Sequence, residues 1–344
     1  MGINTNSHMQ IAVVGLGLMG SSIVVSLLAS GHQVVALAPL PGEKEIAIKH
    51  IVGLLRHADD SNLLTKGLAA SVQALKVTDD YQDIAPCKFV QECVIEDKDI
   101  KKIVYQRIAD HVSEDTVIAS NTSAIPISEL QQFVPMPSRF IGVHWAEPAY
   151  MTRFLEVTCG EQTDMVVAEH VVQLGKNWGK EPTLLKKDIR GFITNRLMYA
   201  VYREALTLAE RGDTTLEDAD KIFRYDVGSW ITLMGIFRRL DFVGFADYIP
   251  SFASLLKQLS NRSDVPLVME RMVAENARGI HNCKGLYPYS EQEAKAWEEA
   301  FAHFNKDIYE LATQYGEQRL LEAIPYDVEE DKLYDVEEDK LSKI

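Results

Sequence analysis

A histidine and a glutamate twelve residues apart have the types and spacing to exchange a proton with a substrate. His144 ends the run Arg139-Phe-Ile-Gly-Val-His144, and Glu156 lies in Phe154-Leu-Glu-Val-Thr158; both runs have the composition of strands. A histidine at a strand end can take the proton of a hydroxyl while its carbon gives a hydride to a cofactor. A carboxylate at the other ring nitrogen would stabilise the imidazolium. Taken alone, the pair is equally consistent with a structural histidine and an unrelated surface glutamate.

A glycine-rich turn near the start of the chain supplies the second chemical signal. The segment Gly15-Leu16-Gly17-Leu18-Met19-Gly20 matches G-x-G-x-x-G between an apolar run and a helical pattern. Gly15 permits the tight turn, Gly17 lets the backbone approach a pyrophosphate, and Gly20 lets the helix pack close to the strand. The N–H groups that open this helix, around Leu18 and Met19, would bind the pyrophosphate. We therefore predict a dinucleotide site here, with a turn that binds nothing as the alternative.

The residues after the second expected strand bear on the choice of dinucleotide. Ala38 stands where an Asp or Glu usually binds the ribose 2′-hydroxyl of NAD. This change removes a repulsion against the 2′-phosphate of NADP, but no Arg stands adjacent to attract one. Glu43 could supply the missing carboxylate, and Lys44 could instead serve a phosphate. We expect NAD as the cofactor, with NADP as the alternative.

Short apolar runs alternate with helical patterns through the first half of the chain. The expected strands are 10–15, 33–38, 89–95, 116–119, 140–144, 154–158 and 183–185, and helical patterns occupy 21–29, 100–112 and 165–178. This alternation is typical of a doubly wound, mostly parallel sheet covered by helices on both faces. The sequence predicts an α/β Rossmann domain over residues 10–187.

The second half of the chain has a different texture. After Lys187 the sequence holds amphipathic segments at 192–210, 216–223, 252–259 and 290–315, and almost no strand-like runs. We predict an all-α domain over residues 188–318 that binds substrate. Its apolar faces, which include Leu233, Ile236 and Phe237, also predict a homodimer.

Both termini are expected to lie outside the fold. Residues 1–9 resemble an expression-vector remnant. The tail 319–344 contains the same eight residues twice, at 326–333 and 334–341, which is too few copies for a solenoid. Its acidic composition favours a solvated tail over a partner-binding motif.

Charge and cysteine usage exclude several classes of function. The formal net charge of −15 opposes non-specific nucleic-acid binding, which depends on Lys and Arg. The 4 cysteines form no CxxC pair and have no histidine at ligand spacing, so we expect no metal site and no disulfide framework. No apolar stretch approaches the roughly 20 residues that span a bilayer. These features predict a cytoplasmic protein with a small-molecule substrate and no membrane partner.

Five segments together resemble the 3-hydroxyacyl-CoA dehydrogenase family, in its order and spacing, over roughly residues 10–315. They are Glu92-Cys-Val-Ile-Glu96-Asp97 through Lys101, Ser120-Asn121-Thr122-Ser123, His144-Trp-Ala-Glu-Pro148 with Leu155-Glu156-Val157, Gly191-Phe-Ile-Thr-Asn195-Arg196-Leu197 and Lys284-Gly285-Leu286-Tyr287-Pro288-Tyr289. The resemblance implies a site in the cleft between a Rossmann domain and a helical dimerisation domain.

The same resemblance implies roles for individual residues. By that match His144 is the general acid/base and Glu156 orients it, while Ser120 and Asn195 hold the substrate oxygen. A hydroxyl and an amide can both donate hydrogen bonds to that oxygen. Three further residues would contact the cofactor, namely Glu92, Lys101 and Asn121. Each of these residues also has an alternative role. Ser120 could cap a helix, Asn195 could be a surface helix residue, and Lys101 could be a solvated helix charge.

One departure from the family pattern concerns the substrate. Glu147 replaces the Asn that family members commonly carry just beyond the catalytic histidine, so it could repel a carboxylate or bind a sugar-like hydroxyl. Arg153 could meet an anionic group, with a surface arginine as the alternative. The family acts on acyl-CoA thioesters in fatty acid metabolism, and includes relatives that act on free acids, such as gulonate and carnitine dehydrogenases.

We therefore predict an NAD(P)-dependent dehydrogenase of a 3-hydroxyacyl-CoA or of a related free 3-hydroxy acid. A non-catalytic dinucleotide-binding protein is an alternative of another class, because Rossmann folds host many functions. A 6-phosphogluconate or hydroxyisobutyrate dehydrogenase is a third. Those enzymes generally use a lysine in the helical domain, which the surroundings of Asn195 do not offer.

Overall fold

A computed structural model describes residues 9–314, except for some side chains in the helices Phe245–Leu255 and Glu291–Gln314. The predicted acidic tail, and the predicted vector remnant apart from Met9, lie outside the described residues.

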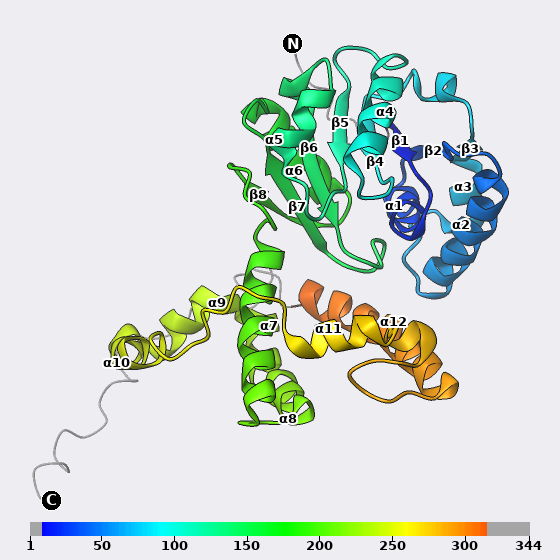
Figure 1. Cartoon of the computed structure of the whole chain (residues 1–344). Coiled ribbons are helices and arrows are strands. Elements are labelled where there is room, and N and C mark those ends of the chain that lie inside the picture. Colours follow the sequence, from blue (N-terminus) through cyan, green and yellow to red (C-terminus); the bar gives the residue numbers. More distant parts are fainter. Residues whose placement is uncertain (1–8, 315–344) are drawn as a thin grey trace, which may run out of the picture.

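The first half of the chain forms one sheet of eight strands in the order β3-β2-β1-β4-β5-β6-β7-β8 (Figure 1). The strands are β1 (Gln10–Val14), β2 (Gln33–Leu37), β3 (Leu75–Thr78), β4 (Phe89–Glu92), β5 (Val117–Ser120), β6 (Phe140–Trp145), β7 (Phe154–Cys159) and β8 (Glu181–Leu185). All neighbours run parallel except β6 and β7. The predicted doubly wound, mostly parallel sheet is confirmed. Strand β3 was missed because it is short and only partly buried.

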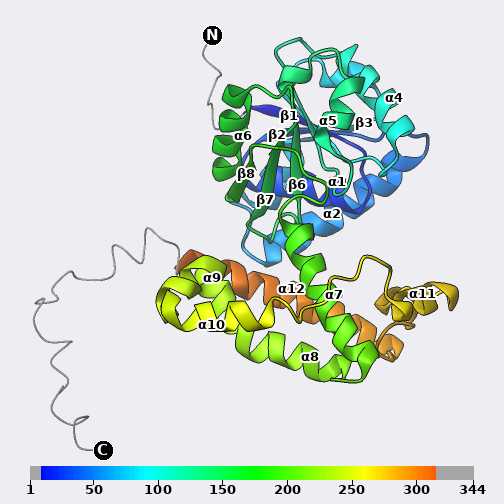
Figure 2. The same ribbon diagram turned by 60° about the vertical axis from the view of Figure 1, so that its left-hand side comes forward.

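Helices cover both faces of this sheet. One face carries α1 (Leu18–Ala29), α2 (Glu43–Asp60) and α6 (Met165–Asn177), and the other carries α4 (Lys98–Ala109) and α5 (Ile127–Leu130). Figure 2 shows α6 and α4 on opposite sides of the strands. Short helices connect these elements at α3 (Gly67–Gln73), Tyr81–Ile84, Gln131–Phe133 and Pro137–Arg139.

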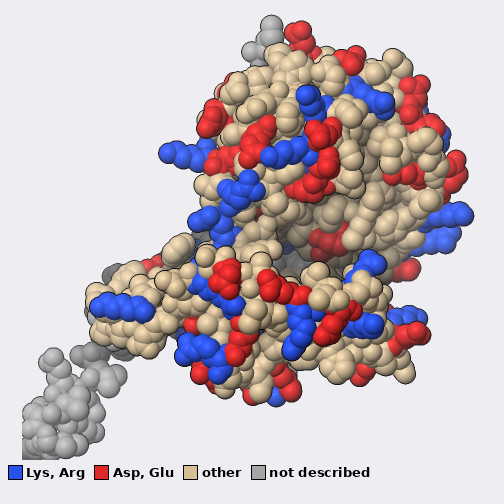
Figure 3. Space-filling model, in the orientation of Figure 1, with Lys and Arg blue, Asp and Glu red and all other residues tan. Residues whose placement is uncertain are grey.

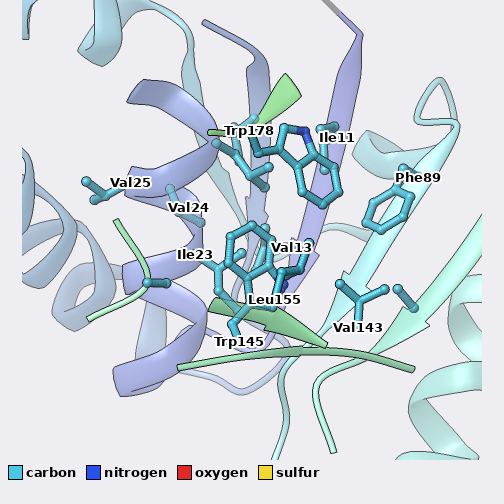
Figure 4. Close-up of a cluster of buried hydrophobic side chains, with 14 of the residues drawn as sticks. Ile11, Val13, Ile23, Val24, Val25, Phe89, Val143, Trp145, Leu155 and Trp178 are labelled. Atoms are coloured by element: carbon cyan, nitrogen blue, oxygen red, sulfur yellow. The ribbon is translucent and has the colours of Figure 1, made fainter. Parts of the chain in front are cut away.

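The period-two alternation of the strands explains why two cores form. In β1, Ile11 and Val13 face the first core, while Ala12 and Val14 face the second. Figure 4 shows Ile11 and Val13 in the first core together with Trp145 and Trp178. Burial of each such large side chain contributes about 1.5–3 kcal/mol, so a buried parallel strand needs apolar residues on both faces.

The turn between β1 and α1 depends on its glycines. Gly15 has a φ of 92°, in the left-handed region that favours glycine. A Cβ on Gly20 would lie 1.9 Å from the carbonyl oxygen of Gly15, whereas a Cβ on Gly17 would meet nothing within 4 Å. Gly20 is therefore required for the close packing of α1 on the turn, and Gly17 leaves open space beside the backbone.

The second half of the chain is helical. Its elements are α7 (Thr194–Arg211), α8 (Leu216–Ile222), the π-helical turn Phe223–Val227, α9 (Gly228–Val243), α10 (Phe245–Leu255), α11 (Leu267–Ala274), the turn Ile280–Asn282 and α12 (Glu291–Gln314). In Figures 1 and 2, α9 and α10 lie on one side of α7 and α11 lies on the other. Among the described residues after Arg190, Phe192 and Ala294 are the only buried hydrophobic side chains. The helical region therefore leaves many of its large apolar side chains exposed in a single chain.

We expect Gly20→Ala to destabilise the protein and Gly17→Ala to leave its stability unchanged. Alanine normally stabilises a helix by about 1 kcal/mol relative to glycine, but overpacking against the Gly15 carbonyl costs about 3 kcal/mol and reverses the sign. Thermal unfolding followed by circular dichroism measures the difference. Equal melting temperatures for both variants would contradict the packing role of Gly20.

Candidate active site

The antiparallel pairing of β6 and β7 brings His144 and Glu156 together. The two residues are direct cross-strand partners, so their side chains stand on the same face of the sheet. His144 Nδ1 lies 3.3 Å from Glu156 Oε2, and the glutamate side chain is 1% exposed. The rings of Phe154 and Phe192 lie 5.5 and 5.9 Å from the imidazole centroid. The imidazole is therefore held on several sides, with Nδ1 directed at a buried carboxylate.

The second oxygen of Glu156 binds the helical half of the chain. Glu156 Oε1 accepts hydrogen bonds from the backbone N–H groups of Ile193, at 2.9 Å, and Thr194, at 3.4 Å. These groups open α7, where unpaired N–H groups and the helix dipole favour a negative charge. One carboxylate thus connects the histidine of the sheet to the first helix of the second half.

Ser123 is the hydroxyl that faces the histidine. Its Oγ lies 3.1 Å from His144 Nε2, the nitrogen opposite the glutamate. The side-chain amide of Asn195, on α7, donates to the backbone carbonyl of Ser123 at 3.0 Å. Ser123, His144 and Asn195 therefore meet where the sheet contacts the helical region.

The structure corrects the prediction for Ser120. This residue is 0% exposed and donates a 2.7 Å hydrogen bond to Glu92 Oε2, a bond that directs its hydroxyl into the interior. Ser120 is the last residue of β5, and Ser123 lies in the turn beyond that edge. The strand residue is therefore covered, while the turn residue reaches the histidine. The run of polar residues from 120 to 123 indicated polar groups at the end of this strand, but the sequence did not indicate which hydroxyl lies beyond the sheet.

Glu92 and Lys101, predicted to contact the cofactor, pair with each other in the interior. Their side chains are 0% and 1% exposed, and Lys101 Nζ lies 2.7 Å from Glu92 Oε1. Tyr105 completes this cluster by donating a 2.6 Å hydrogen bond to Glu92 Oε2. Burial and the negative charge of Glu92 raise the pKa of the Tyr105 hydroxyl well above its usual value, which keeps it a donor. Buried charges require partners, and the members of this cluster supply them to one another.

Two further polar residues hold the backbone around the site. Asn121 Oδ1 accepts a 2.9 Å hydrogen bond from the N–H of Trp145, so its side chain fixes the end of β6 beside His144. Glu96, to which the sequence assigns no role, accepts hydrogen bonds from the N–H groups of Ser123, at 3.0 Å, and Ala124, at 3.1 Å. Its position four residues after Glu92 in the matched segment was the available signal.

The glycine-rich turn has the features that a pyrophosphate needs. No side chain caps the N-terminus of α1, and no acidic residue occupies its first turn. Leu18 is 61% exposed and Met19 is partly buried. The N–H groups at this end are therefore available to an anion, and Gly17 leaves the space for its approach.

The ribose side of this site is less defined. Glu43 and Lys44 open α2, where Glu43 accepts a 3.3 Å hydrogen bond from the N–H of Leu40 and Lys44 pairs with Asp79 at 3.4 Å. The carboxylate of Glu43 and the ammonium group of Lys44 therefore both have partners within the protein.

The segment between β6 and β7 holds the partly buried Glu147 and contacts the buried Lys180. Glu147 is partly buried, and its Oε2 has no hydrogen-bond partner among the described residues. Burial raises the pKa of Glu147 from its ordinary 4.5 to about 7, against a smaller lowering by the hydroxyl of Ser22. Lys180 donates to the carbonyls of Ala149 and Thr152, at 2.5 and 2.6 Å, and burial lowers its pKa to about 7. These contacts fix the segment that follows His144.

Arg153, the other predicted substrate residue, forms an ion pair with Glu181 at the beginning of β8. The Glu181 side chain is 69% exposed, and such exposed pairs contribute at most about 1 kcal/mol.

The described residues contain no group of three His, Cys, Asp or Glu side chains that could hold a metal ion. None of the described helices is long and apolar enough to cross a membrane. In the space-filling view of Figure 3, the surface is hollowed between the sheet region and the helices.

Comparison with known proteins connects this geometry to a family. The model of the 3-hydroxyacyl-CoA dehydrogenase NAD binding domain matches residues 10–189, and that of the C-terminal domain matches residues 191–289. The chain is 36% identical over 291 residues to a 5-formyl-3-hydroxy-2-methylpyridine 4-carboxylate 5-dehydrogenase of Mesorhizobium japonicum, covering 83% of this chain and 92% of that protein. It is 28% identical over 312 residues to an L-carnitine dehydrogenase of Staphylococcus epidermidis, covering 89% of this chain and 95% of that protein.

A solved structure shares the whole architecture. The crystal structure of a 5-formyl-3-hydroxy-2-methylpyridine 4-carboxylic acid 5-dehydrogenase, described as an NAD+ dependent dismutase, superposes with a TM-score of 0.81 at 31% identity. The match covers 91% of this chain and 98% of that structure.

The pKa of Glu147 predicts a pH-dependent stability. The pKa of Glu147 in the folded protein lies above its ordinary value of 4.5. The contribution of this group to the free energy of unfolding is therefore fully present below pH 4.5 and is lost as the pH rises through about 7. We expect the free energy of unfolding of Glu147→Gln, relative to that of wild type, to be about 1–2 kcal/mol higher at pH 8 than at pH 5, after allowance for solvent screening. Chemical denaturation at both pH values measures this gain. The exposed Glu114→Gln is the matched control, and an equal effect of Glu147→Gln at both pH values would contradict the assignment.

Proposed function

The chain belongs to the 3-hydroxyacyl-CoA dehydrogenase family, and we propose that it interconverts a hydroxyl and a carbonyl group on a small organic acid with NAD as cofactor. The observation that carries this proposal is the position of His144 between two partners. Glu156 lies at Nδ1, and a hydroxyl lies at Nε2. Nε2 is therefore the nitrogen that can receive a proton.

His144 is the general acid/base of the proposed reaction. In the oxidation direction, Nε2 takes the proton of the substrate hydroxyl, and the Glu156 carboxylate accepts the Nδ1–H and stabilises the imidazolium. The Ser123 hydroxyl is 3.1 Å from Nε2 in the structure, which supports this position as the place for a substrate oxygen. NAD, when bound, supplies the acceptor for the hydride.

Ser123 and Asn195 are the proposed donors to the substrate oxygen. Both lie on the open side of His144, one in the turn after β5 and one on α7, and they are joined through the Ser123 carbonyl. A hydroxyl and an amide can donate to the oxygen both as an alcohol and as a carbonyl. Ser123 thus replaces Ser120 in this role.

The cofactor and domain assignments complete the proposal. We assign dinucleotide binding to the turn formed by Gly15, Gly17, Leu18, Met19 and Gly20 and to the N-terminus of α1. NAD is favoured over NADP by the name of the matching family model and by that of the solved relative. We assign residues 10–187 to the cofactor domain and residues 188–318 to the substrate and dimer domain.

The relatives favour a free acid over a CoA thioester as substrate. The relative at 36% identity is named for a pyridine carboxylate, and another is named for L-carnitine. Glu147 is the proposed specificity residue, because it lies three residues after His144 and its Oε2 has no hydrogen-bond partner among the described residues. A CoA thioester is the second candidate, favoured by the name of the matching family models.

We expect NADH oxidation with free keto or formyl acids at a kcat/KM at least tenfold above that with acetoacetyl-CoA, and weaker activity with NADPH. A panel of free acids that includes dehydrocarnitine and pyridine carboxylates, read by absorbance, measures both preferences. His144→Ala should lower kcat about 10³-fold and leave the NADH dissociation constant within twofold.

The outcomes of this panel separate the candidates. Rapid reduction of acetoacetyl-CoA with no activity on free acids would assign the thioester. Tight NADH binding without turnover on any substrate would instead favour a non-catalytic dinucleotide-binding protein.

A homodimer is the proposed assembly. Large apolar side chains of the helical region are highly exposed in the single chain; examples are Tyr199 at 68%, Phe237 at 79%, Phe242 at 73% and Val273 at 75%. Exposed apolar surface on this scale marks an association site, and burial of each such side chain contributes about 1.5–3 kcal/mol.

We expect sedimentation equilibrium at about 10 μM to give a dimer of about 77 kDa, twice the chain mass of 38.6 kDa. Phe237→Glu should shift the protein towards monomer, because it places a charge on the apolar surface. The exposed polar site Lys257→Glu is the control. A wild-type protein that sediments as a monomer would contradict the dimer.

A further inference from the structure

The carboxylate of Glu96 organises the turn that follows β5. Glu96 Oε1 accepts hydrogen bonds from the N–H groups of Ser123 and Ala124, at 3.0 and 3.1 Å, and from the hydroxyl of Thr122. Three donors from consecutive residues therefore converge on one oxygen. Charge-assisted hydrogen bonds of this kind are about twice as strong as neutral ones.

This turn carries the hydroxyl that faces the histidine. Ser123 is held by Glu96 at its N–H and by Asn195 at its carbonyl, which leaves its side chain directed to His144 Nε2 at 3.1 Å. The two hydrogen bonds to its backbone fix the position of Ser123, and this position sets the direction of its side chain. We therefore expect the loss of the Glu96 contact to displace the hydroxyl together with the backbone.

Lys101 connects Glu96 to the buried cluster below. Its Nζ lies 2.7 Å from Glu92 Oε1 and 3.4 Å from Glu96 Oε2. Burial alone would raise the pKa of Glu96, but the Thr122 hydroxyl, the Lys101 charge and the N–H groups of Ala124 and Ser123 together lower it. Glu96 is therefore an anion at neutral pH, and the side of its carboxylate away from Lys101 binds the turn.

We infer that Glu96 is a positioning residue that sets the hydroxyl of Ser123 against His144 Nε2 through the backbone of the 122–124 turn. This inference rests on the proposed function of Ser123 and His144. Glu96 itself need not touch the substrate, because its carboxylate acts through the three donors of the turn.

The test compares Glu96→Gln, Ser123→Ala and the double variant in the full-length enzyme. Glutamine keeps the size of the side chain but loses the charge, so we expect kcat to fall about tenfold in Glu96→Gln. Ser123→Ala should lower kcat about 10²-fold, and the double variant should be no slower than Ser123→Ala. The NADH dissociation constant should stay within twofold throughout. Glu114→Gln, at an exposed position in the turn before β5, is the control for the chemical change.

Two results would overturn the inference. Losses that multiply in the double variant would show that Glu96 acts independently of Ser123. An unchanged kcat with a tenfold weaker NADH dissociation constant would make Glu96 a cofactor ligand instead.

A second readout keeps the inference apart from the proposed function. If the wild-type enzyme turns over no substrate in the panel, the His144 ring signal in ¹³C-labelled protein, assigned with His144→Ala, reports on the same contact. Glu96→Gln should shift this signal in the direction of Ser123→Ala, and a signal identical to wild type would overturn the inference.

Discussion

The carboxylate of Glu156 is the interaction on which the rest of the site depends. It is almost fully buried, and it binds His144 through one oxygen and the first N–H groups of α7 through the other. A buried carboxylate is costly unless it is paired, so its partners must both be present in the folded protein. The position of the imidazole and the attachment of the helical half are therefore parts of a single arrangement. The change of strand direction between β6 and β7 makes this arrangement possible, because it places residues 144 and 156 side by side.

Beneath this pair, ionisable groups are used as structure. Glu92, Lys101 and Tyr105 satisfy one another in the interior, and Lys101 extends the cluster to Glu96 at the surface. Removing one member of a buried ion pair costs about 3–5 kcal/mol, because the other charge is left without a partner. The cluster therefore gives the turn at Ser123 a rigid base. Lys180 has a similar role on the other side of His144, where it binds two carbonyls of the segment before β7.

The sheet and its helices were predictable because their signals are local. Strands such as Gln10–Val14 and Phe140–Trp145 are apolar on both faces, and the glycine-rich turn follows the first of them directly. Strand β3 gives only a weak signal, since it has 4 residues and these lie partly exposed at the end of the sheet. In the helical region, amphipathic periodicity gave the positions of α7 and α12. The segment expected at 252–259 overlaps only the end of α10, which begins at Phe245 and ends at Leu255.

The sequence by itself determined the fold class, the family and the presence of a histidine and a glutamate able to move a proton. The tertiary structure decided which side chains accompany them. The sequence does not distinguish Ser120 from Ser123, because both are serines in one polar run. The strand ends at Ser120, so the sheet buries the hydroxyl of Ser120, while that of Ser123 lies beside His144. Glu92 and Lys101 likewise carry charges that suit a ligand, but they face each other in the interior. Burial and hydrogen-bond partners arise from contacts between distant segments, and no local pattern encodes them.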